Sequence, residues 1–316
     1  MKTLALVFSR LLDPTDPLMR LGQKKPIYFE FLKVCAEKGF KVVVASSRSY
    51  QGDGLFGEYW DVDYENQSCH KQSGSINVDI VYDRTAGQAF PPSDESIIVV
   101  DSKEFKKLCW NKWSMYELLE QYMPQTYYIQ NKSEIPEVLT KIKGETVVLK
   151  PHNGLKGRGI YIGPKDGALD FSFKKSGFPY LAQEFIETEG GIEGIAPTGR
   201  KHDLRIVMIN QKIVWSHVRV PRQGEMLANM TKEGGYLKEV LPEVIPEIVR
   251  KTALEIGAVL YEKYNNPLFS LDFAMQGGQL FLLEINDQIG FPREDMVGKD
   301  VFIEELASNL ATKAGL

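Results

Sequence analysis

The sequence predicts an α/β protein that begins with an open parallel sheet and continues with two α+β subdomains. A strand–helix–strand order in the first fifty residues is typical of a parallel sheet. From Asp101 the pattern changes to helices followed by strands that return on themselves. A chain of 316 residues can bury two or three hydrophobic cores. We therefore expect units at residues 1–101, 102–182 and 183–316.

The first unit starts with an apolar strand at residues 3–9 and a helix at residues 26–38. Pro26 suits the first turn of that helix and Gly39 suits its end. Further strands are expected at residues 41–46, 78–82 and 96–100, whereas residues 47–77 are not assigned. No GxGxxG motif follows the first strand, which argues against a nicotinamide-binding Rossmann site.

The elements of the other two units follow from the same patterns, with Ser102 as a helix N-cap. They are one or two helices in residues 101–122, a strand at 126–130, a helix at 133–143, strands at 145–151, 159–163, 180–187, 203–209 and 212–220, a helix at 242–264, a hairpin within 268–286 and a helix at 301–314.

Composition and charge exclude several classes of protein. The formal net charge of −4 gives no basic field for nucleic acid or an anionic membrane. No apolar stretch approaches 18 residues, and the apolar run in MKTLALVF is too short for a signal peptide, so it is interpreted as the first strand. Cys35, Cys69 and Cys109 are scattered and odd in number, which favours a reducing compartment. We expect a cytoplasmic protein.

The hairpin in residues 268–286 carries three polar residues in an otherwise apolar stretch: Asp272, Glu284 and Asn286. Their oxygen atoms are the ligands that Mg²⁺ prefers. Glu284 and Asn286 share a face because they are two apart on a strand. Asp272 joins that face if the loop is three residues long, Gln276-Gly277-Gly278, but not if it is Gly-Gly alone. An edge hairpin with one solvated face and no metal is an equally weighted alternative.

A glycine-rich turn follows the strand that ends at Lys150, in the segment VVLKPHNGLKGRGIYIG. Its glycines are Gly154, Gly157 and Gly159, and backbone N–H groups of such a turn can bind phosphate. A plain hairpin with a basic tip is the alternative. Lys150 favours the phosphate site, because a lysine at the end of an apolar strand is costly unless it meets an anion.

The order of these motifs resembles the ATP-grasp superfamily. It runs Lys112, Lys150 with the glycine turn, the strand AQEFIE, Arg205, Asn229 and the Asp/Glu/Asn hairpin. The glutathione-synthetase-like branch that includes the ribosomal-protein glutamate ligase is the most similar, over residues 100–295. The resemblance implies an ATP-grasp fold in which two α+β subdomains clasp ATP.

The resemblance also implies a role for individual residues in binding the nucleotide. Lys112 and Lys150 match the lysines that contact phosphates, and the turn residues Asn153, Gly154, Gly157 and Gly159 match the loop that covers them. The strand residues Gln183, Glu184, Phe185 and Ile186 match the linker at the adenine. Glu187, Glu189 and Glu193 are candidates for the ribose that the sequence does not separate.

For the reacting centre, the resemblance implies that Asp272, Glu284 and Asn286 bind two Mg²⁺ ions, with Mn²⁺ as an alternative metal. Arg205 and Arg219 match the family's arginines at the transferred phosphate, although surface ion pairs are the alternative. Asn229 matches a catalytic loop residue, although an ordinary loop would look the same.

The function implied is that of an ATP-dependent, ADP-forming carboxylate–amine ligase that acts through an acyl phosphate. Its substrates would be a small carboxylate and an amine of amino-acid or peptide type. The alternatives are an ATP-binding regulator or a phosphotransferase without an amine step, and an interaction protein without nucleotide. Nothing in the sequence decides whether the chain forms a homo-oligomer.

Two regions are expected to determine the substrate. Residues 287–292 depart from the family pattern because the proline is displaced and Asp287 adds a carboxylate. In the N-terminal unit, Arg10 and Arg84 follow strand ends, where open α/β sheets bind ligands. Either arginine suits a substrate carboxylate or a surface ion pair.

Overall fold

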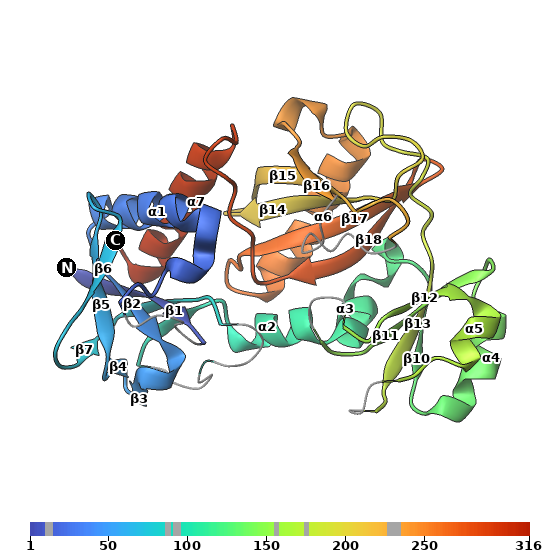
Figure 1. The fold of residues 1–316 in the computed structure, drawn as a ribbon, viewed down its shortest axis with the longest axis horizontal. Coiled ribbons are helices and arrows are strands. Elements are labelled where there is room, and N and C mark those ends of the chain that lie inside the picture. The colour runs from blue at the N-terminus through green and yellow to red at the C-terminus, as the bar shows by residue number, and fades with distance from the viewer. Residues whose placement is uncertain (10–14, 86–89, 91–95, 155–157, 174–176, 226–234) are drawn as a thin grey trace.

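A computed structural model describes residues 1–9, 15–85, 90, 96–154, 158–173, 177–225 and 235–316. The molecule has three main sheets, and the two chain ends lie close together at one end of it (Figure 1). No helix in these ranges is long and apolar enough to cross a membrane.

The N-terminal sheet has the strand order β6-β5-β2-β1-β8-β9. The four strands from β2 to β9 are parallel, as predicted, while β5 and β6 are antiparallel. Its elements are β1 (Lys2–Phe8), the 3₁₀ segment η1 (Met19–Lys24), α1 (Lys25–Glu37), β2 (Phe40–Ser46), β5 (Tyr59–Asp63), β6 (Ser68–Lys71), β8 (Ile80–Asp83) and β9 (Ile98–Val100). The unassigned segment also forms a small separate sheet of β3 (Tyr50–Gly52), β4 (Leu55–Phe56) and β7 (Ile76–Asn77).

Two helices, α2 (Lys103–Trp110) and α3 (Lys112–Leu119), lead to a four-stranded antiparallel sheet. Ser102 caps α2 as predicted, since its Oγ accepts a hydrogen bond from Phe105 N at 3.2 Å. The sheet has the order β10-β13-β11-β12. Its elements are β10 (Thr126–Ile129), α4 (Ile135–Lys141), β11 (Thr146–Pro151), β12 (Tyr161–Pro164), α5 (Lys165–Leu169) and β13 (Tyr180–Glu184).

The C-terminal sheet has five antiparallel strands in the order β16-β15-β14-β17-β18. Its elements are β14 (Asp203–Ile209), β15 (Lys212–Val220), β16 (Tyr236–Glu239), α6 (Glu247–Lys263), β17 (Phe269–Gln276) and β18 (Gln279–Asn286). One face of this sheet is apolar and packs against α2, α3 and α6 in a shared core. The opposite face carries the polar residues of the site.

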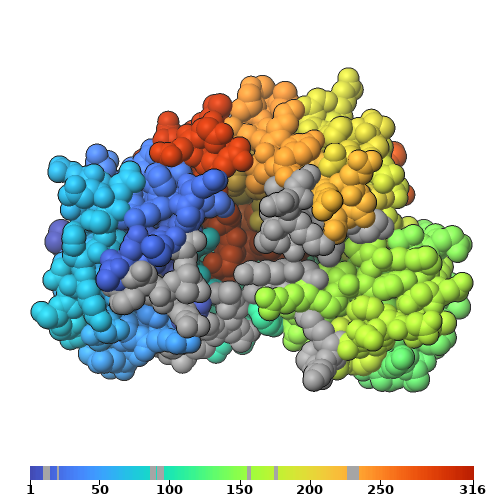
Figure 2. All heavy atoms as spheres, in the orientation of Figure 1, coloured from blue at the N-terminus to red at the C-terminus, as the bar shows by residue number. Residues whose placement is uncertain are grey.

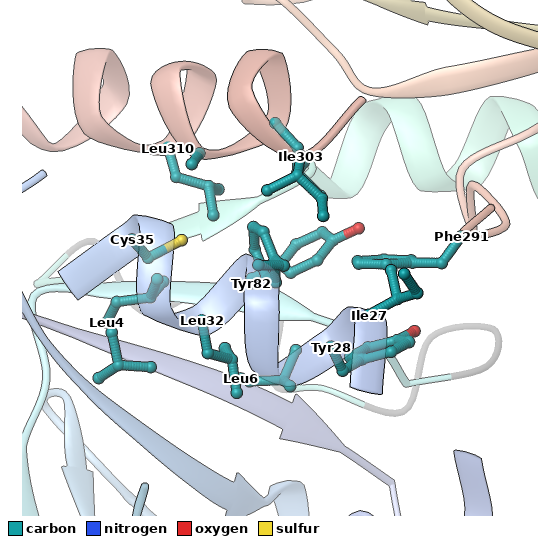
Figure 3. Close-up of a cluster of buried hydrophobic side chains, with 14 of the residues drawn as sticks. Leu4, Leu6, Ile27, Tyr28, Leu32, Cys35, Tyr82, Phe291, Ile303 and Leu310 are labelled. Atoms are coloured by element: carbon teal, nitrogen blue, oxygen red, sulfur yellow. The ribbon is translucent and has the colours of Figure 1, made fainter. Parts of the chain in front are cut away.

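The last helix, α7 (Lys299–Ala314), joins the N-terminal part of the molecule. Its residues Ile303 and Leu310 share a core with Leu4, Leu32 and Cys35 of β1 and α1, and Figure 3 shows these side chains facing one another. Phe291, from the loop after β18, enters the same core and stacks on Tyr28. The C-terminal and N-terminal parts are therefore packed together, while the boundaries at residues 101 and 182 stay predictions.

The hairpin of β17 and β18 shows that the predicted loop length is wrong. Gln276 pairs with Gln279, so the loop has the two residues Gly277 and Gly278, both with positive φ (57° and 81°). The register shifts further along, because Phe273 pairs with Leu282 but Asp272 pairs with Glu284. β18 therefore contains a β-bulge with one extra residue. This extra residue, and not a three-residue loop, places Asp272 on the same face as Glu284. Asp272 and Glu284 therefore lie opposite each other on one face, as predicted.

Candidate functional site

Two arginines and two aspartates form an ion-pair network on the polar face of the C-terminal sheet. Arg205 donates from Nε and Nη2 to the two carboxylate oxygens of Asp272, both at 2.6 Å. Arg219 donates to Asp203 at 2.6 and 2.7 Å and, through Nη2, to Asp272 Oδ2 at 2.8 Å. The antiparallel register places Arg205 beside Asp272 and Asp203 beside Arg219. This geometry gives Asp272 three charge-assisted hydrogen bonds.

These contacts explain how a nearly buried carboxylate stays ionised. Burial alone would raise the pKa of Asp272, but the charges and hydrogen bonds of Arg205 and Arg219 outweigh it and hold the pKa well below its usual range. Burial dominates at Asp203 and raises its pKa despite Arg219. In this structure the two arginines therefore neutralise Asp272.

Glu284 lies opposite Asp272 and contacts Lys112. Its Oε1 is 2.8 Å from Lys112 Nζ, and its side chain is 32% exposed. Lys112 Nζ also donates to the carbonyl oxygen of Gly154 at 3.0 Å. Asn286 donates from Nδ2 to Asp272 Oδ2 at 3.2 Å. Lys112 therefore connects the C-terminal hairpin to the first residues of the glycine turn.

Lys150 is the second buried lysine that faces this region. Its Nζ donates to Gln183 Oε1 at 2.8 Å, and Gln183 in turn donates to Thr126 Oγ1 at 2.8 Å. Burial and the nearby charge of Lys112 lower the pKa of Lys150 to about 8, with Glu284 opposing them. The structure thus brings Lys112, Lys150 and Glu284 together, although they come from three distant parts of the sequence.

The glycine turn begins beside the N-terminus of α3. Lys112 N donates to His152 O at 2.7 Å, and Asn111 pairs with the exposed Asn153 as an isolated bridge. Gly154 and Gly159 have positive φ angles of 133° and 76°, which only glycine adopts readily. Gly157 lies outside the described residues, as does the candidate catalytic residue Asn229.

The predicted linker strand connects the two sheets. Gln183 and Glu184 end β13, and Glu184 N donates to Gln125 O at 3.0 Å. Ile186 is buried and Phe185 is half-buried. Glu187 N donates to Gln276 Oε1, beside the turn of the β17–β18 hairpin, at 2.5 Å. The chain therefore passes from the four-stranded sheet to the five-stranded sheet through residues 184–187.

Two of the three ribose candidates share a lysine. Lys201 Nζ forms an ion pair with Glu187 and lies 3.3 Å from Glu189 Oε1. It also lies 5.0 Å from the ring centroid of Phe185. Glu193 is exposed and stands apart from this cluster. Lys201 could not be singled out from the sequence, because a lysine in a glycine-rich loop has no pattern that separates it from a solvated one.

The oxygen atoms of the hairpin suit a hard cation, but the two arginines already bind the Asp272 carboxylate. Asp272, Glu284 and Asn286 present oxygen atoms on one face, as Mg²⁺ prefers. Asp272 Oδ1 accepts one hydrogen bond and keeps a lone pair for a metal, whereas Oδ2 already accepts three, from Arg205, Arg219 and Asn286. Among the described residues no three His, Cys, Asp or Glu side chains cluster as metal ligands. A metal here would thus depend on the two carboxylates, the Asn286 amide and a phosphate.

An open pocket of about 650 Å³ lies elsewhere, along the outer side of α2 and α3. Asn111, His152 and Asn153 are among its lining residues, but Lys112, Lys150 and the hairpin residues are not. The pocket therefore borders the start of the glycine turn but not Lys112, Lys150 or the hairpin residues.

Solved structures show which known fold this chain has. D-alanyl-alanine synthetase A from Vibrio cholerae O1 biovar eltor str. N16961 matches with a TM-score of 0.67 and 16% identity, over 100% of this chain and 99% of that one. A RimK domain ATP-grasp protein from Sphaerobacter thermophilus DSM 20745 matches with a TM-score of 0.60 and 12% identity, over 98% and 99% of the two chains. The fold is that of the ATP-grasp proteins, as predicted.

The model of the YheC/D-like ATP-grasp family matches residues 102–314, and the chain belongs to that family. A curated relative from Cellvibrio japonicus (strain Ueda107), named probable alpha-L-glutamate ligase, is 24% identical over 200 residues. That match covers 60% of this chain and 60% of the relative, so the chain spans less than two thirds of the relative's length.

Proposed function

We propose that this protein is an ATP-dependent, ADP-forming carboxylate–amine ligase that acts through an acyl phosphate. The observation that carries the proposal is the ion pair between Lys112 and Glu284, with Lys112 Nζ 2.8 Å from the Glu284 carboxylate, beside the buried Lys150, on which both of these charges act. Two buried lysines beside an oxygen-donor hairpin suit a metal-bound polyphosphate. The names of the relatives, which include glutamate and D-alanine ligases, support the same class of reaction.

In the proposed reaction, a carboxylate oxygen of the first substrate attacks the γ-phosphorus of ATP, and ADP leaves with the electrons of the broken P–O bond. The amine nitrogen of the second substrate then attacks the acyl carbon. Inorganic phosphate leaves, and the nitrogen loses a proton. No step needs a covalent bond to the protein, since positioning and charge neutralisation are sufficient for phosphoryl transfer.

Each part of the site has a role in this proposal. Lys112 and Lys150 contact the phosphates, and the turn of residues 153–159 covers them. The backbone of residues 183–186 meets the adenine, and an acidic residue among Glu187, Glu189 and Glu193 meets the ribose. The Lys201 ion pairs favour Glu187 or Glu189 for this role, because Lys201 holds both carboxylates at the linker.

At the reacting centre, Arg205 and Arg219 stabilise the transferred phosphate and the acyl phosphate. Asp272, Glu284 and Asn286 would hold Mg²⁺, which when bound neutralises phosphate charge. We propose two ions, with Mn²⁺ as a substitute. The ion pair between Glu284 and Lys112 would then be exchanged for contacts with metal and phosphate. Asn229 is proposed to face the same centre.

The substrates proposed are a carboxylic acid and an amine of amino-acid or peptide type. We also propose a cytoplasmic location, in keeping with three buried cysteines that form no disulfide.

The test is ADP release from Mg·ATP in the presence of mixed amino acids, with wild type and Glu284→Gln. The variant keeps the size of the side chain but removes its charge, so we expect ADP release to fall at least about a hundredfold, as for other losses of transition-state charge stabilisation. Glu262→Gln, on the exposed surface of α6, is the matched control and should keep wild-type activity. Wild-type turnover in Glu284→Gln would overturn the proposal.

A further inference from the structure

Asn153, at the start of the glycine turn, is the one asparagine of the sequence that a glycine follows. Glycine has no side chain, so the peptide nitrogen of Gly154 is open to the side-chain carbonyl carbon of the asparagine before it. Gly154 has a φ of 133°, which only glycine adopts readily. The shape of the turn thus requires the very residue that makes the preceding asparagine chemically labile.

The Asn153 side chain is exposed and lies in the wall of the open pocket of about 650 Å³ along α2 and α3. Asn111 and His152 line the same pocket. Water therefore reaches the Asn153 amide, and the pocket leaves room for this side chain to turn toward Gly154 N.

His152 contacts the amide nitrogen of Asn153. Its Nδ1 lies 3.2 Å from the carbonyl oxygen of Pro179, and since a carbonyl only accepts, Nδ1 carries a proton. Its Nε2 lies 3.2 Å from Asn153 Nδ2 and in the neutral ring accepts a hydrogen bond from it. When the ring takes up a second proton, that proton is on Nε2. His152 is therefore placed to protonate Nδ2 if this nitrogen leaves as ammonia.

The residue after Asn153 is bonded to the proposed nucleotide site. Gly154 O accepts a hydrogen bond from Lys112 Nζ at 3.0 Å, and the same Nζ lies 2.8 Å from Glu284 Oε1. Lys112 N also donates to His152 O at 2.7 Å. Figure 2 shows that the green part of the molecule, which contains β11, borders a hollow on the face displayed. A change in charge or backbone length at Asn153 would therefore act on the lysine that we assign to the phosphates.

We propose that Asn153 is a site of spontaneous deamidation, with His152 as the proton donor, and that the carboxylate formed there weakens nucleotide binding. Gly154 N attacks Cγ of Asn153, the bond from Cγ to Nδ2 breaks, and ammonia leaves while Gly154 N loses its proton. Water then opens the resulting succinimide at either carbonyl. The product is aspartate, or isoaspartate, in which the backbone is longer by one carbon atom.

Both products place a negative charge one residue before the glycine whose carbonyl oxygen binds Lys112. The new carboxylate repels the phosphates of a nucleotide and competes with them for the Lys112 ammonium. Isoaspartate also lengthens the backbone between His152 and Gly154, which displaces the Gly154 carbonyl. The protein would thus lose nucleotide affinity with age. The deamidation itself needs no ligand, whereas its effect on the nucleotide rests on the proposed function.

Peptide mass spectrometry of the full chain, sampled over several weeks at neutral pH, tests the chemical step. We expect Asn153 to lose its amide well before Asn77 and Asn131, which are also exposed but precede valine and lysine. His152→Gln should slow the conversion, because it removes the group that protonates ammonia, and an unchanged rate would overturn the role of His152. An Asn153 that keeps its amide as long as Asn77 and Asn131 do would overturn the whole inference.

Calorimetry with Mg·ADP tests the effect on the nucleotide site. Asn153→Asp carries the charge of the product from the start, and we expect it to bind Mg·ADP at least about tenfold more weakly than fresh wild type, as for one charged contact. Asn131→Asp is the matched control, because it adds the same charge at another exposed position of the same part of the molecule. It should bind as wild type does, and equal affinities of the two variants would overturn the effect on binding.

Asn153→Gln separates this reaction from a general loss of the fold. Glutamine must close a larger ring and loses its amide more slowly, so aged Asn153→Gln should bind Mg·ADP as its own fresh sample does, whereas aged wild type should not. Equal loss of affinity in the two proteins would overturn the inference, since ageing would then proceed elsewhere. Failure of fresh wild type to bind Mg·ADP would instead contradict the proposed function, and mass spectrometry would still decide the fate of Asn153.

Discussion

Lys150 lowers the stability of the ligand-free protein, because its buried charge is suited to binding a ligand. Its ammonium is nearly buried and makes one hydrogen bond, to Gln183. Burial and the charge of Lys112 lower its pKa from 10.5 to about 8, so the charged form is unfavourable without an anion. A phosphate would supply that anion.

We predict that Lys150→Met stabilises the ligand-free protein at pH 7 while it abolishes the effect of Mg·ATP. The gain should be about 1–2 kcal/mol, because removal of a desolvated charge outweighs the lost hydrogen bond to Gln183. Thermal unfolding with and without Mg·ATP measures both effects. Lys141→Met, on an exposed helix surface, is the control. A destabilised variant that still responds to Mg·ATP would contradict this role.

The stability of the free protein should change with pH in a direction that the pKa of Lys150 determines. Folding lowers the pKa of Lys150 from 10.5 to about 8. Between these pH values the unfolded chain therefore binds more protons than the folded chain does. The stability of the free wild type should therefore gain a contribution as pH rises from 8 to 10.5, and Lys150→Met should lack it. Mg·ATP binding should weaken above pH 8 in wild type, because the deprotonated lysine no longer attracts phosphate.

At the scale of elements, the C-terminal hairpin combines a tight turn with a bulge. Gly277 and Gly278 both have positive φ, and a Cβ atom at either position would meet nothing within 4 Å. Only backbone strain thus opposes a side chain there. We predict that Gly278→Val lowers stability by about 1–2 kcal/mol, whereas Gly277→Asn is tolerated because asparagine suits this turn. Urea unfolding of the two variants measures this, and equal midpoints would show that the turn is not of this type.

The same hairpin shows how far the sequence could predict the site. Alternation along the strand predicts that Glu284 and Asn286 share a face, but the register of Asp272 depends on where an extra residue is accommodated. Periodicity does not distinguish a three-residue loop from a bulge near Leu283. Either one adds a single unpaired residue between Asp272 and Glu284, and so brings both side chains to the same face. The sequence predicts the shared face, while the structure shows that a bulge produces it.

Other elements differ in how readily the sequence predicts them. The strand predicted at residues 212–220 agrees with β15, because five of its nine residues are Ile, Val or Trp, which favour strands. Strands β3 to β7 escaped assignment because they are two to five residues long, too short for alternation to appear. Lys201 was missed because nothing in the sequence shows that it pairs with Glu187 and Glu189.

At the scale of the whole molecule, α7 connects the last residues of the chain to the first sheet. Leu306 is fully buried in the core that α7 shares with β1 and α1. The sequence predicts this helix but not its partner, since an apolar helix face does not identify the surface that covers it. The packing holds the loop after the hairpin, and with it Phe291, against the N-terminal part.

We predict that Leu306→Ala costs about 2–5 kcal/mol, as for other buried leucines, and increases hydrogen exchange in α1. The control is Lys299→Gln, which removes the ion pair between Lys299 and Glu30 on the same two helices. That half-exposed pair should contribute less than about 1 kcal/mol. Exchange in α1 that is unchanged by Leu306→Ala would show that α7 and α1 are not one cooperative unit.

The central claim is that the site formed by Lys112, Lys150 and Glu284 activates a carboxylate with ATP. The most direct measurement is trapping of the acyl phosphate with hydroxylamine, using Mg·ATP, mixed amino acids and short peptides, and wild type beside Glu284→Gln. The account predicts a hydroxamate, formed in step with ADP, from wild type but not from the variant. Tight binding of Mg·ATP by wild type without any hydroxamate would contradict it and favour a regulatory ATP-binding protein.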